Sequence, residues 1–252
     1  MDLMKILSEF LGTLFLVLLG NGVVYSVSAK RMFANQSGKW SVITLGWGFA
    51  VMVGVIISNA LGGSAHLNPA VSIFDAIASK SAFPLVYIPA QFLGAMVAQV
   101  ILNFINWNHI KETDLATVRG AHATGPAFSA KEKGTIFNFS YELVGTLVLL
   151  GVILAFGKGS NALSTTGIGL SSLGPLPVTF LVMAIGMSLG SSTGYAINPA
   201  RDLGPRLVYF AMEKLLLSNR KEEHVGANFE YSWIPVVAPS FAGVIIGLFA
   251  LI

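Results

Sequence analysis

The stretch "GYAINPARDLGPRL", residues 194–207, places two arginines and an aspartate inside an otherwise apolar region. Its centre is repeated in "SAHLNPAVS", residues 64–72, so that Asn-Pro-Ala occurs twice in the chain. The apolar segments that follow the two copies, roughly 69–79 and 199–212, are too short to cross a bilayer, which takes about 20 residues. Apolar segments of this length predict re-entrant half-helices, each beginning at an Asn-Pro-Ala motif.

The composition indicates that lipid is the main solvent of this chain. Of its 252 residues, 54% are hydrophobic and 11% are charged, whereas a soluble domain has roughly 25% charged residues. The chain has no cysteine, which excludes disulfides and thiolate metal sites. The net charge is +3 without a dense run of Lys or Arg, so we expect no nucleic-acid partner.

Runs of membrane-spanning length predict an all-α integral membrane protein with a single domain over residues 1–252. The first run reaches spanning length and its pattern returns in mid-chain, so we interpret it as a membrane helix and not as a signal peptide. The six predicted crossings lie near 5–28, 41–60, 84–107, 136–157, 175–192 and 232–252.

The chain also contains an internal repeat. "SEFLGTLFLVLLG" at 8–20 aligns with "YELVGTLVLLG" at 141–151, and an Asn-Pro-Ala motif follows each at a similar distance. We place the two halves at about 1–110 and 134–252, joined by a loop at about 108–135. Three crossings in the first half place the second half upside down in the bilayer. The two half-helices then start from opposite faces and meet near the midplane.

The paired motifs predict a passage for polar, uncharged molecules. A proline suits the first position of a helix, and an asparagine before it caps the helix through its side-chain oxygen. The amide NH2 group then remains as a donor, next to a helix end that carries roughly half a positive charge. Such a site offers hydrogen bonds to a hydroxyl and opposes protons and cations. The motif residues are Asn68, Pro69, Ala70, Asn198, Pro199 and Ala200.

With these motifs and the two Glu-x-x-Gly-Thr helices, the chain resembles the aquaporin and aquaglyceroporin channels, the major intrinsic proteins. The resemblance implies six transmembrane helices and two re-entrant half-helices, one pore per chain, and a homotetramer. It also implies a multi-pass protein of the plasma membrane with both termini in the cytoplasm. With cytoplasmic termini most Lys and Arg residues would lie outside the cell. The positive-inside rule therefore favours the opposite orientation.

The resemblance further implies a selectivity filter of four residues, Trp47, Gly186, Tyr195 and Arg201. Arg201 would line the narrowest point, where its guanidinium suits two hydroxyls of a polyol and repels cations. Trp47 and Tyr195 would form apolar walls opposite it, and Gly186 would leave room that a histidine fills in water-selective members. Two structural readings stay open: Trp47 as an interfacial anchor, and Gly186 as part of a small-residue helix contact.

Non-helical backbone at membrane depth must line a cavity or be buried, so its carbonyls should form the acceptor side of the path. The candidates are Ser64, Ala65, His66, Gly194, Tyr195 and Ala196. We interpret Glu9 and Glu142 as acceptors for the N–H groups of the re-entrant loops. The resemblance assigns Asp202 to positioning the second half-helix. His66 has no second ligand at metal spacing, so no metal site is predicted.

Together these patterns predict a passive channel for glycerol and similar uncharged solutes that also conducts water and excludes ions and protons. Urea and undissociated lactic acid are further candidate solutes. One alternative is a water-selective aquaporin, which the absence of a histidine at 186 disfavours. A second is a coupled secondary transporter of a small polyol or hydroxy acid, because inverted repeats also occur there. We find no catalytic constellation and expect neither enzymatic activity nor a cofactor.

Overall fold

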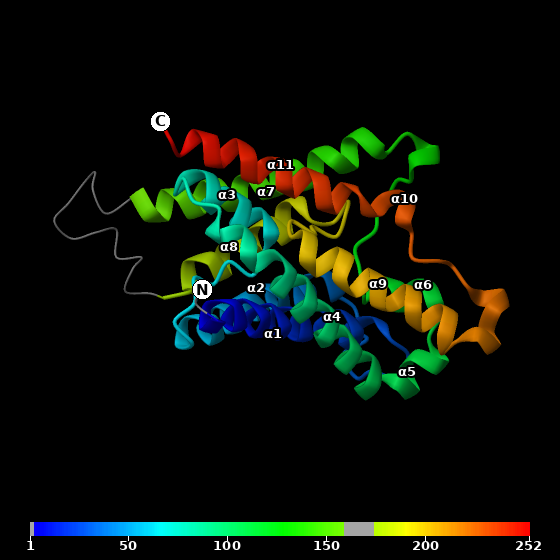
Figure 1. The fold of residues 1–252 in the computed structure, drawn as a ribbon. Helices are drawn as coiled ribbons and strands as arrows, with labels where there is room; N and C mark the ends of the chain where they lie inside the picture. Colours follow the sequence, from blue (N-terminus) through cyan, green and yellow to red (C-terminus); the bar gives the residue numbers. More distant parts are fainter. Residues whose placement is uncertain (1–2, 159–173) are drawn as a thin grey trace.

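The computed structural model describes residues 3–158 and 174–252, and these residues form helices and loops without a strand. Figure 1 shows the long helices lying side by side along one direction, with the short helices α5 and α6 at one end. The helices of the first half are α1 Leu3–Ser28, α2 Lys39–Ala60, α3 Pro69–Ala78, and α4 Tyr87–Ile105 after the 3-10 turn η1 Phe83–Val86. Those of the second half are α7 Thr135–Lys158, α8 Leu176–Leu189, α9 Pro199–Leu215, α10 Phe229–Ser232 and α11 Ile234–Phe249.

Five helical segments are long and apolar enough to cross a membrane within the described ranges. They are Leu3–Ser28, Lys39–Ala60, Phe83–Ile105, Thr135–Gly157 and Phe229–Phe249. The predicted crossing at 175–192 corresponds to α8, which has 14 residues and is therefore shorter than expected. The protein is a multi-pass membrane protein.

Two further predictions differ from the structure. The half-helix predicted at 199–212 continues to Leu215, because hydropathy marks where the apolar stretch ends and a helix can continue through polar Glu213 and Lys214. The predicted loop at 108–135 contains α5 Trp107–Glu112, α6 Leu115–Gly120 and the 3-10 turn η2 Ala130–Glu132. Residues 158–174, which separate the predicted crossings at 136–157 and 175–192, fall almost entirely outside the described residues. A last 3-10 segment, η4 Ser218–Glu223, follows α9.

Helix packing follows the repeat. Helix α1 packs against α2 and α4, and its counterpart α7 packs against α8 and α11. The half-helices cross over between the halves, since α3 lies against α11 and α9 lies against α4. Helices α2 and α8, the second helices of the two halves, contact each other. Each half thus holds the half-helix of the other, which ties the two halves into one domain.

Close approach of each half-helix to the helix that holds it requires a glycine on one side of the contact. A Cβ added at Gly243 of α11 would lie 2.6 Å from the carbonyl oxygen of Ala70 in α3. On the other side, a Cβ at Gly204 of α9 would lie 3.1 Å from the Cβ of Ala95 in α4. Small residues at such contacts allow backbones to approach closely inside a membrane, where van der Waals packing drives helix association.

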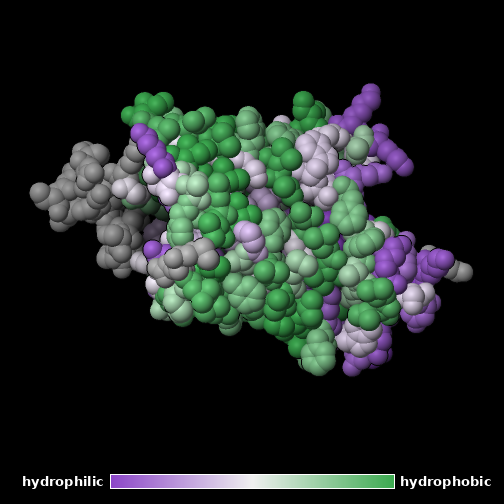
Figure 2. Space-filling model, in the orientation of Figure 1, coloured by the Kyte–Doolittle hydropathy of each residue, from purple (hydrophilic) through white to green (hydrophobic). Residues whose placement is uncertain are grey.

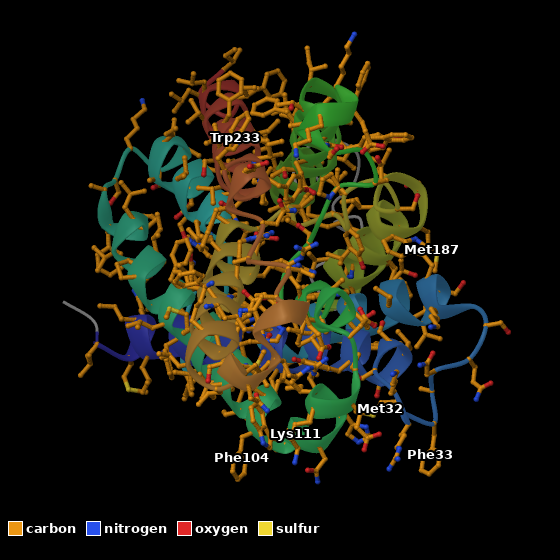
Figure 3. All side chains as sticks on the ribbon, turned by 90° about the vertical axis from the view of Figure 1, so that its right-hand side faces the viewer. Met32, Phe33, Phe104, Lys111, Met187 and Trp233 are labelled. Carbon is orange, nitrogen blue, oxygen red and sulfur yellow. The ribbon has the colours of Figure 1, made fainter. Side chains whose placement is uncertain are left out.

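The outer surface is apolar around the middle of the bundle. In Figure 2 hydrophobic residues form a broad band, and hydrophilic residues gather at the ends, most visibly at the end that carries α5 and α6. Seen end on in Figure 3, the helices surround a common centre, and Phe104, Met187 and Trp233 point outward. These three side chains are exposed, as expected for residues that face lipid.

Candidate pore

The two Asn-Pro-Ala motifs meet through their asparagines. Asn68 Nδ2 donates to the carbonyl of Ile197 at 2.8 Å, and Asn198 Nδ2 donates to the carbonyl of Leu67 at 2.8 Å. Each asparagine also caps its own half-helix, because Asn68 Oδ1 accepts from the N–H of Ala70 at 2.9 Å. Asn198 Oδ1 accepts from the N–H groups of both Ala200 and Arg201. One hydrogen of each amide NH2 is therefore committed to the opposite loop, and the other is left for a solute.

The loops that precede the motifs share an unusual backbone. Ala65 and Leu67 in the first loop, and Tyr195 and Ile197 in the second, have positive φ values between 37° and 53°. L-residues adopt this region at a cost of about 1 kcal/mol or more, so something must hold the loops in this conformation.

Two buried glutamates hold these loops. Glu9 of α1 accepts from the backbone N–H groups of His66 and Leu67, both at 2.7 Å. Glu142 of α7 accepts from the N–H groups of Ala196 at 3.0 Å and Ile197 at 2.8 Å. Hydrogen bonds to an ionised carboxylate are about twice as strong as neutral ones. With their N–H groups turned to the glutamates, the loops direct carbonyl oxygens elsewhere, including the two that accept from Asn68 and Asn198.

A cavity of about 580 Å³ runs along these loops. It extends along α2 from Asn59 to Trp47, a length of about 18 Å at 1.5 Å per helical residue. The predicted site residues that line it are Trp47, Ser64, Ala65, His66, Asn68, Tyr195, Ala196, Asn198 and Arg201. Leu67 and Ile197 also line it, whereas Gly194 and Gly186 do not.

Arg201 lies on Trp47. Its guanidinium carbon is 3.9 Å from the centroid of the Trp47 ring, so the two groups stack, whereas the sequence predicted that they face each other across the path. The stacking follows from burial: both side chains are about 95% buried, and the π face of an indole stabilises a desolvated cation. Among the described residues the guanidinium forms no ion pair with a carboxylate and donates no hydrogen bond, so its N–H groups remain available to the cavity that it lines.

The ring of Tyr195 fills the space beside Gly186. The sequence had predicted that this space is open. A Cβ at 186 would lie 2.7 Å from Tyr195 Cζ and 2.9 Å from Thr44 Cγ2. The ring also packs edge-on against Trp40 at 5.8 Å, and Trp40 Nε1 donates to the carbonyl of Gly186. Gly186 thus supports the cavity wall from behind, by making room for the tyrosine ring that lines it.

Asp202 lies outside the cavity and ties α9 to the connecting loop. It accepts from the backbone N–H of Thr124 at 2.8 Å and from the Thr124 hydroxyl at 2.6 Å. It also forms an ion pair with Arg206 at 2.8 Å, in which both side chains are fully buried. Arg206 donates further to the carbonyls of Thr124 and Ala227, both at 2.7 Å. The pair anchors the half-helix that carries Arg201.

Sequence reasoning missed two residues of this region. Asp75 of α3 lines the cavity at the end away from Arg201; the signal was a carboxylate within a half-length apolar segment, since ionisable residues at membrane depth are usually functional. Trp40 supports Tyr195, but nothing in the sequence distinguishes it from an aromatic at the membrane interface. Within the described ranges, no group of three or more His, Cys, Asp or Glu residues could hold a metal ion.

Comparison with known proteins places this architecture in a family. Residues 2–250 match the major intrinsic protein family. The chain belongs to this family. Among the relatives of this major intrinsic protein is a probable glycerol uptake facilitator protein of Mycoplasmoides gallisepticum, 44% identical, with 98% of this chain and 96% of the relative aligned. Glycerol uptake facilitator protein 3 of Lactiplantibacillus plantarum is 40% identical, over 95% of this chain and 92% of the relative.

A solved structure agrees with the fold. The aquaglyceroporin from Plasmodium falciparum superimposes with a TM-score of 0.75 at 30% sequence identity. The alignment covers 98% of this major intrinsic protein and 94% of the other chain. The similarity therefore extends over both halves of the repeat and includes both half-helices.

Proposed function

We propose that this major intrinsic protein is a passive channel for glycerol and other small uncharged solutes, and that it also conducts water. The observation that carries the proposal is one cavity lined by two asparagine amides and by an arginine with uncommitted N–H groups. Beside these donors, Trp47 and Tyr195 present ring surfaces suited to a carbon backbone. The names of the relatives, glycerol uptake facilitators, agree with this assignment.

Three buried carboxylates, Glu9, Glu142 and Asp202, support a passive mechanism over a coupled one. A proton- or cation-coupled transporter needs a carboxylate that can release and rebind its ion during transport. Glu9 and Glu142 each have both oxygens engaged by backbone N–H groups. Asp202 is engaged by Thr124 and Arg206. Releasing any of the three would undo a re-entrant loop or the anchor of α9.

In the proposed channel the selectivity filter consists of Trp47, Tyr195 and Arg201, and Gly186 supports Tyr195. The backbone carbonyls of Ser64, Ala65, His66 and Ala196 guide the solute, and Glu9, Glu142 and Asp202 hold the loops. We further propose a homotetramer in the plasma membrane with cytoplasmic termini and without enzymatic activity, and we include urea and undissociated lactic acid among the candidate solutes.

Stopped-flow light scattering on proteoliposomes tests the proposal. Vesicles containing the purified protein should be permeable to glycerol and water well above empty vesicles, and a proton-gradient uncoupler should leave the glycerol flux unchanged. Urea and lactic acid, measured in the same vesicles, establish the range of solutes. Glycerol permeability equal to that of empty vesicles would refute the glycerol assignment, and abolition of uptake by the uncoupler would favour the coupled transporter. Cross-linking in the same vesicles reports the oligomeric state.

A further inference from the structure

The mouth of the cavity farthest from Arg201 carries a carboxylate of its own. Asp75 lies in the last turn of α3, and its side chain is 41% exposed. A negative charge near the C-terminal end of a helix opposes the helix dipole, so this placement does not serve the stability of α3. Among the described residues that line the cavity, Asp75 is the one acidic residue and Arg201 the one arginine or lysine.

The histidine beside Asp75 belongs to a chain of hydrogen bonds that leads to Glu9. Gln91 Nε2 donates to Glu9 Oε2 and to Ser72 Oγ, both at 2.9 Å. The amide must face this way, because Glu9 can only accept. The Ser72 hydroxyl, which accepts from Gln91, lies 3.1 Å from His66 Nδ1 and can donate its own proton there, the direction that the acceptor Asp75 on the Nε2 side favours. His66 then carries its hydrogen on Nε2.

This tautomer leaves a donor and an acceptor facing each other across a short gap. His66 Nε2 lies 3.6 Å from Asp75 Oδ2, which is too far for a good direct hydrogen bond. The imidazole is fixed on its other side by the edge of the Tyr87 ring, at a centroid distance of 5.2 Å. A contact of this length between two polar groups suits a bridging oxygen that accepts from one and donates to the other.

We propose that His66 and Asp75 form a polyol-binding site at this mouth of the pore. One hydroxyl of the solute accepts from His66 Nε2–H and donates to Asp75 Oδ2, and a neighbouring hydroxyl donates to Asp75 Oδ1. A carboxylate anion is repelled by Asp75, and an ammonium ion, which Asp75 attracts, offers no acceptor to the histidine, so a hydroxyl is the group that satisfies both side chains. The inference deepens the proposed function: it adds a site for the same solutes, at the opposite end from the filter.

The test compares Asp75→Leu with Glu112→Leu, a matched control. Glu112 is 44% exposed and likewise contacts one basic side chain, Arg31, but lies outside the cavity. Radiolabelled glycerol exchange is measured in proteoliposomes as a function of glycerol concentration, and water permeability is measured in the same vesicles. Loss of one or two hydrogen bonds should raise the half-saturating glycerol concentration of Asp75→Leu by about threefold to tenfold, with water permeability unchanged.

A binding measurement separates this inference from the proposed function. Saturation-transfer NMR with millimolar glycerol on the purified proteins should give a weaker signal for Asp75→Leu than for the wild type and Glu112→Leu, whether or not the vesicles conduct glycerol. If wild-type vesicles fail to conduct glycerol, the proposed function fails and the NMR comparison still decides the site. Equal half-saturation and equal NMR signals in both variants would overturn the site. A parallel fall of glycerol and water permeability in Asp75→Leu alone would also overturn it, because it would indicate a general obstruction.

Discussion

The half-helices α3 and α9 begin alike and diverge after their first turn. Each starts with Asn-Pro-Ala, is capped by its asparagine, and follows a loop held by a buried glutamate. The next positions differ: Val71 corresponds to Arg201, and Ser72 corresponds to Asp202. Helix α9 uses its charges for the filter and for a buried ion pair, whereas α3 uses a hydroxyl to orient a histidine. The repeat thus supplies a common frame, and the divergent turn gives the pore two chemically different ends.

The anchors of the two half-helices should differ most in stability. Arg206→Leu leaves Asp202 buried without its cation, which should lower the free energy of unfolding by about 3–5 kcal/mol. Ser72→Ala, at the position equivalent to Asp202, removes neutral hydrogen bonds and should cost about 1 kcal/mol. Thermal melts of the purified variants in one detergent give the comparison. Equal melting temperatures would show that the ion pair is not what holds α9.

The two asparagines test the symmetry of the centre. In Asn68→Asp a carboxylate oxygen would face the carbonyl of Ile197 and could not donate. Loss of the donor and the new repulsion should reduce glycerol permeability on the order of tenfold to a hundredfold. Asn198→Asp should lose less, because Arg201 is three residues away and partly offsets the charge. Stopped-flow measurements at equal protein abundance decide this, and unchanged flux in both variants would contradict the assignment of the pore.

The contact between Gly186 and Tyr195 tests the support of the filter. Gly186→Ala should cost about 1–3 kcal/mol, because its Cβ would meet the Tyr195 ring at 2.7 Å and force it toward the cavity. Glycerol permeability should fall with it, and in combination with Tyr195→Ala the two substitutions should cost less than the sum of their separate effects. Gly151→Ala in α7 is the control, since its Cβ would meet only Ile246 at 3.9 Å and should be tolerated. Melts and flux are measured together. Equal behaviour of the two alanine variants would remove Gly186 from the support of the filter.

The smallest effect concerns a helix cap outside the membrane, where the capping residue is charged. Asp114 caps α6 by accepting from the N–H of Thr117 at 2.8 Å, and this bond lowers the pKa of Asp114 below its ordinary value. Because the folded-state pKa is lowered, ionised Asp114 stabilises the fold at pH values above its unfolded pKa of about 3.9. This stabilisation is lost as the pH falls through the folded-state pKa. Asp114→Ala should therefore cost about 1 kcal/mol near neutral pH.

The pH dependence supplies the check on that cap. The difference in melting temperature between the wild type and Asp114→Ala should shrink as the pH is lowered from 7 to 3. A difference that stays constant over this range would show that the carboxylate charge does not contribute. Asn68 and Asn198 cap α3 and α9 with neutral amides, so no such titration is expected of the caps inside the pore.

The sequence by itself determined five of the six predicted crossings and the two capped half-helices, because these depend on run length and on residues adjacent in the chain. Asn-Pro at a helix start and Glu-x-x-Gly-Thr in two helices are local patterns whose meaning does not depend on distant partners. The boundaries of α9 and the short helices α5 and α6 escaped prediction, because hydropathy reports the edge of the apolar zone and not the end of helical hydrogen bonding.

Only the tertiary structure decided which side chains meet. Lipid and protein interior are both apolar, so a spanning helix that faces lipid on one side and packs on the other shows little periodicity from which to predict its inner face. The stacking of Arg201 on Trp47, the Tyr195 ring against Gly186, and the hydrogen bond of Ser72 to His66 each depend on helix rotation and on rotamers. These are fixed by packing between segments far apart in the chain, and they decide how the common frame of the repeat becomes two different ends of one pore.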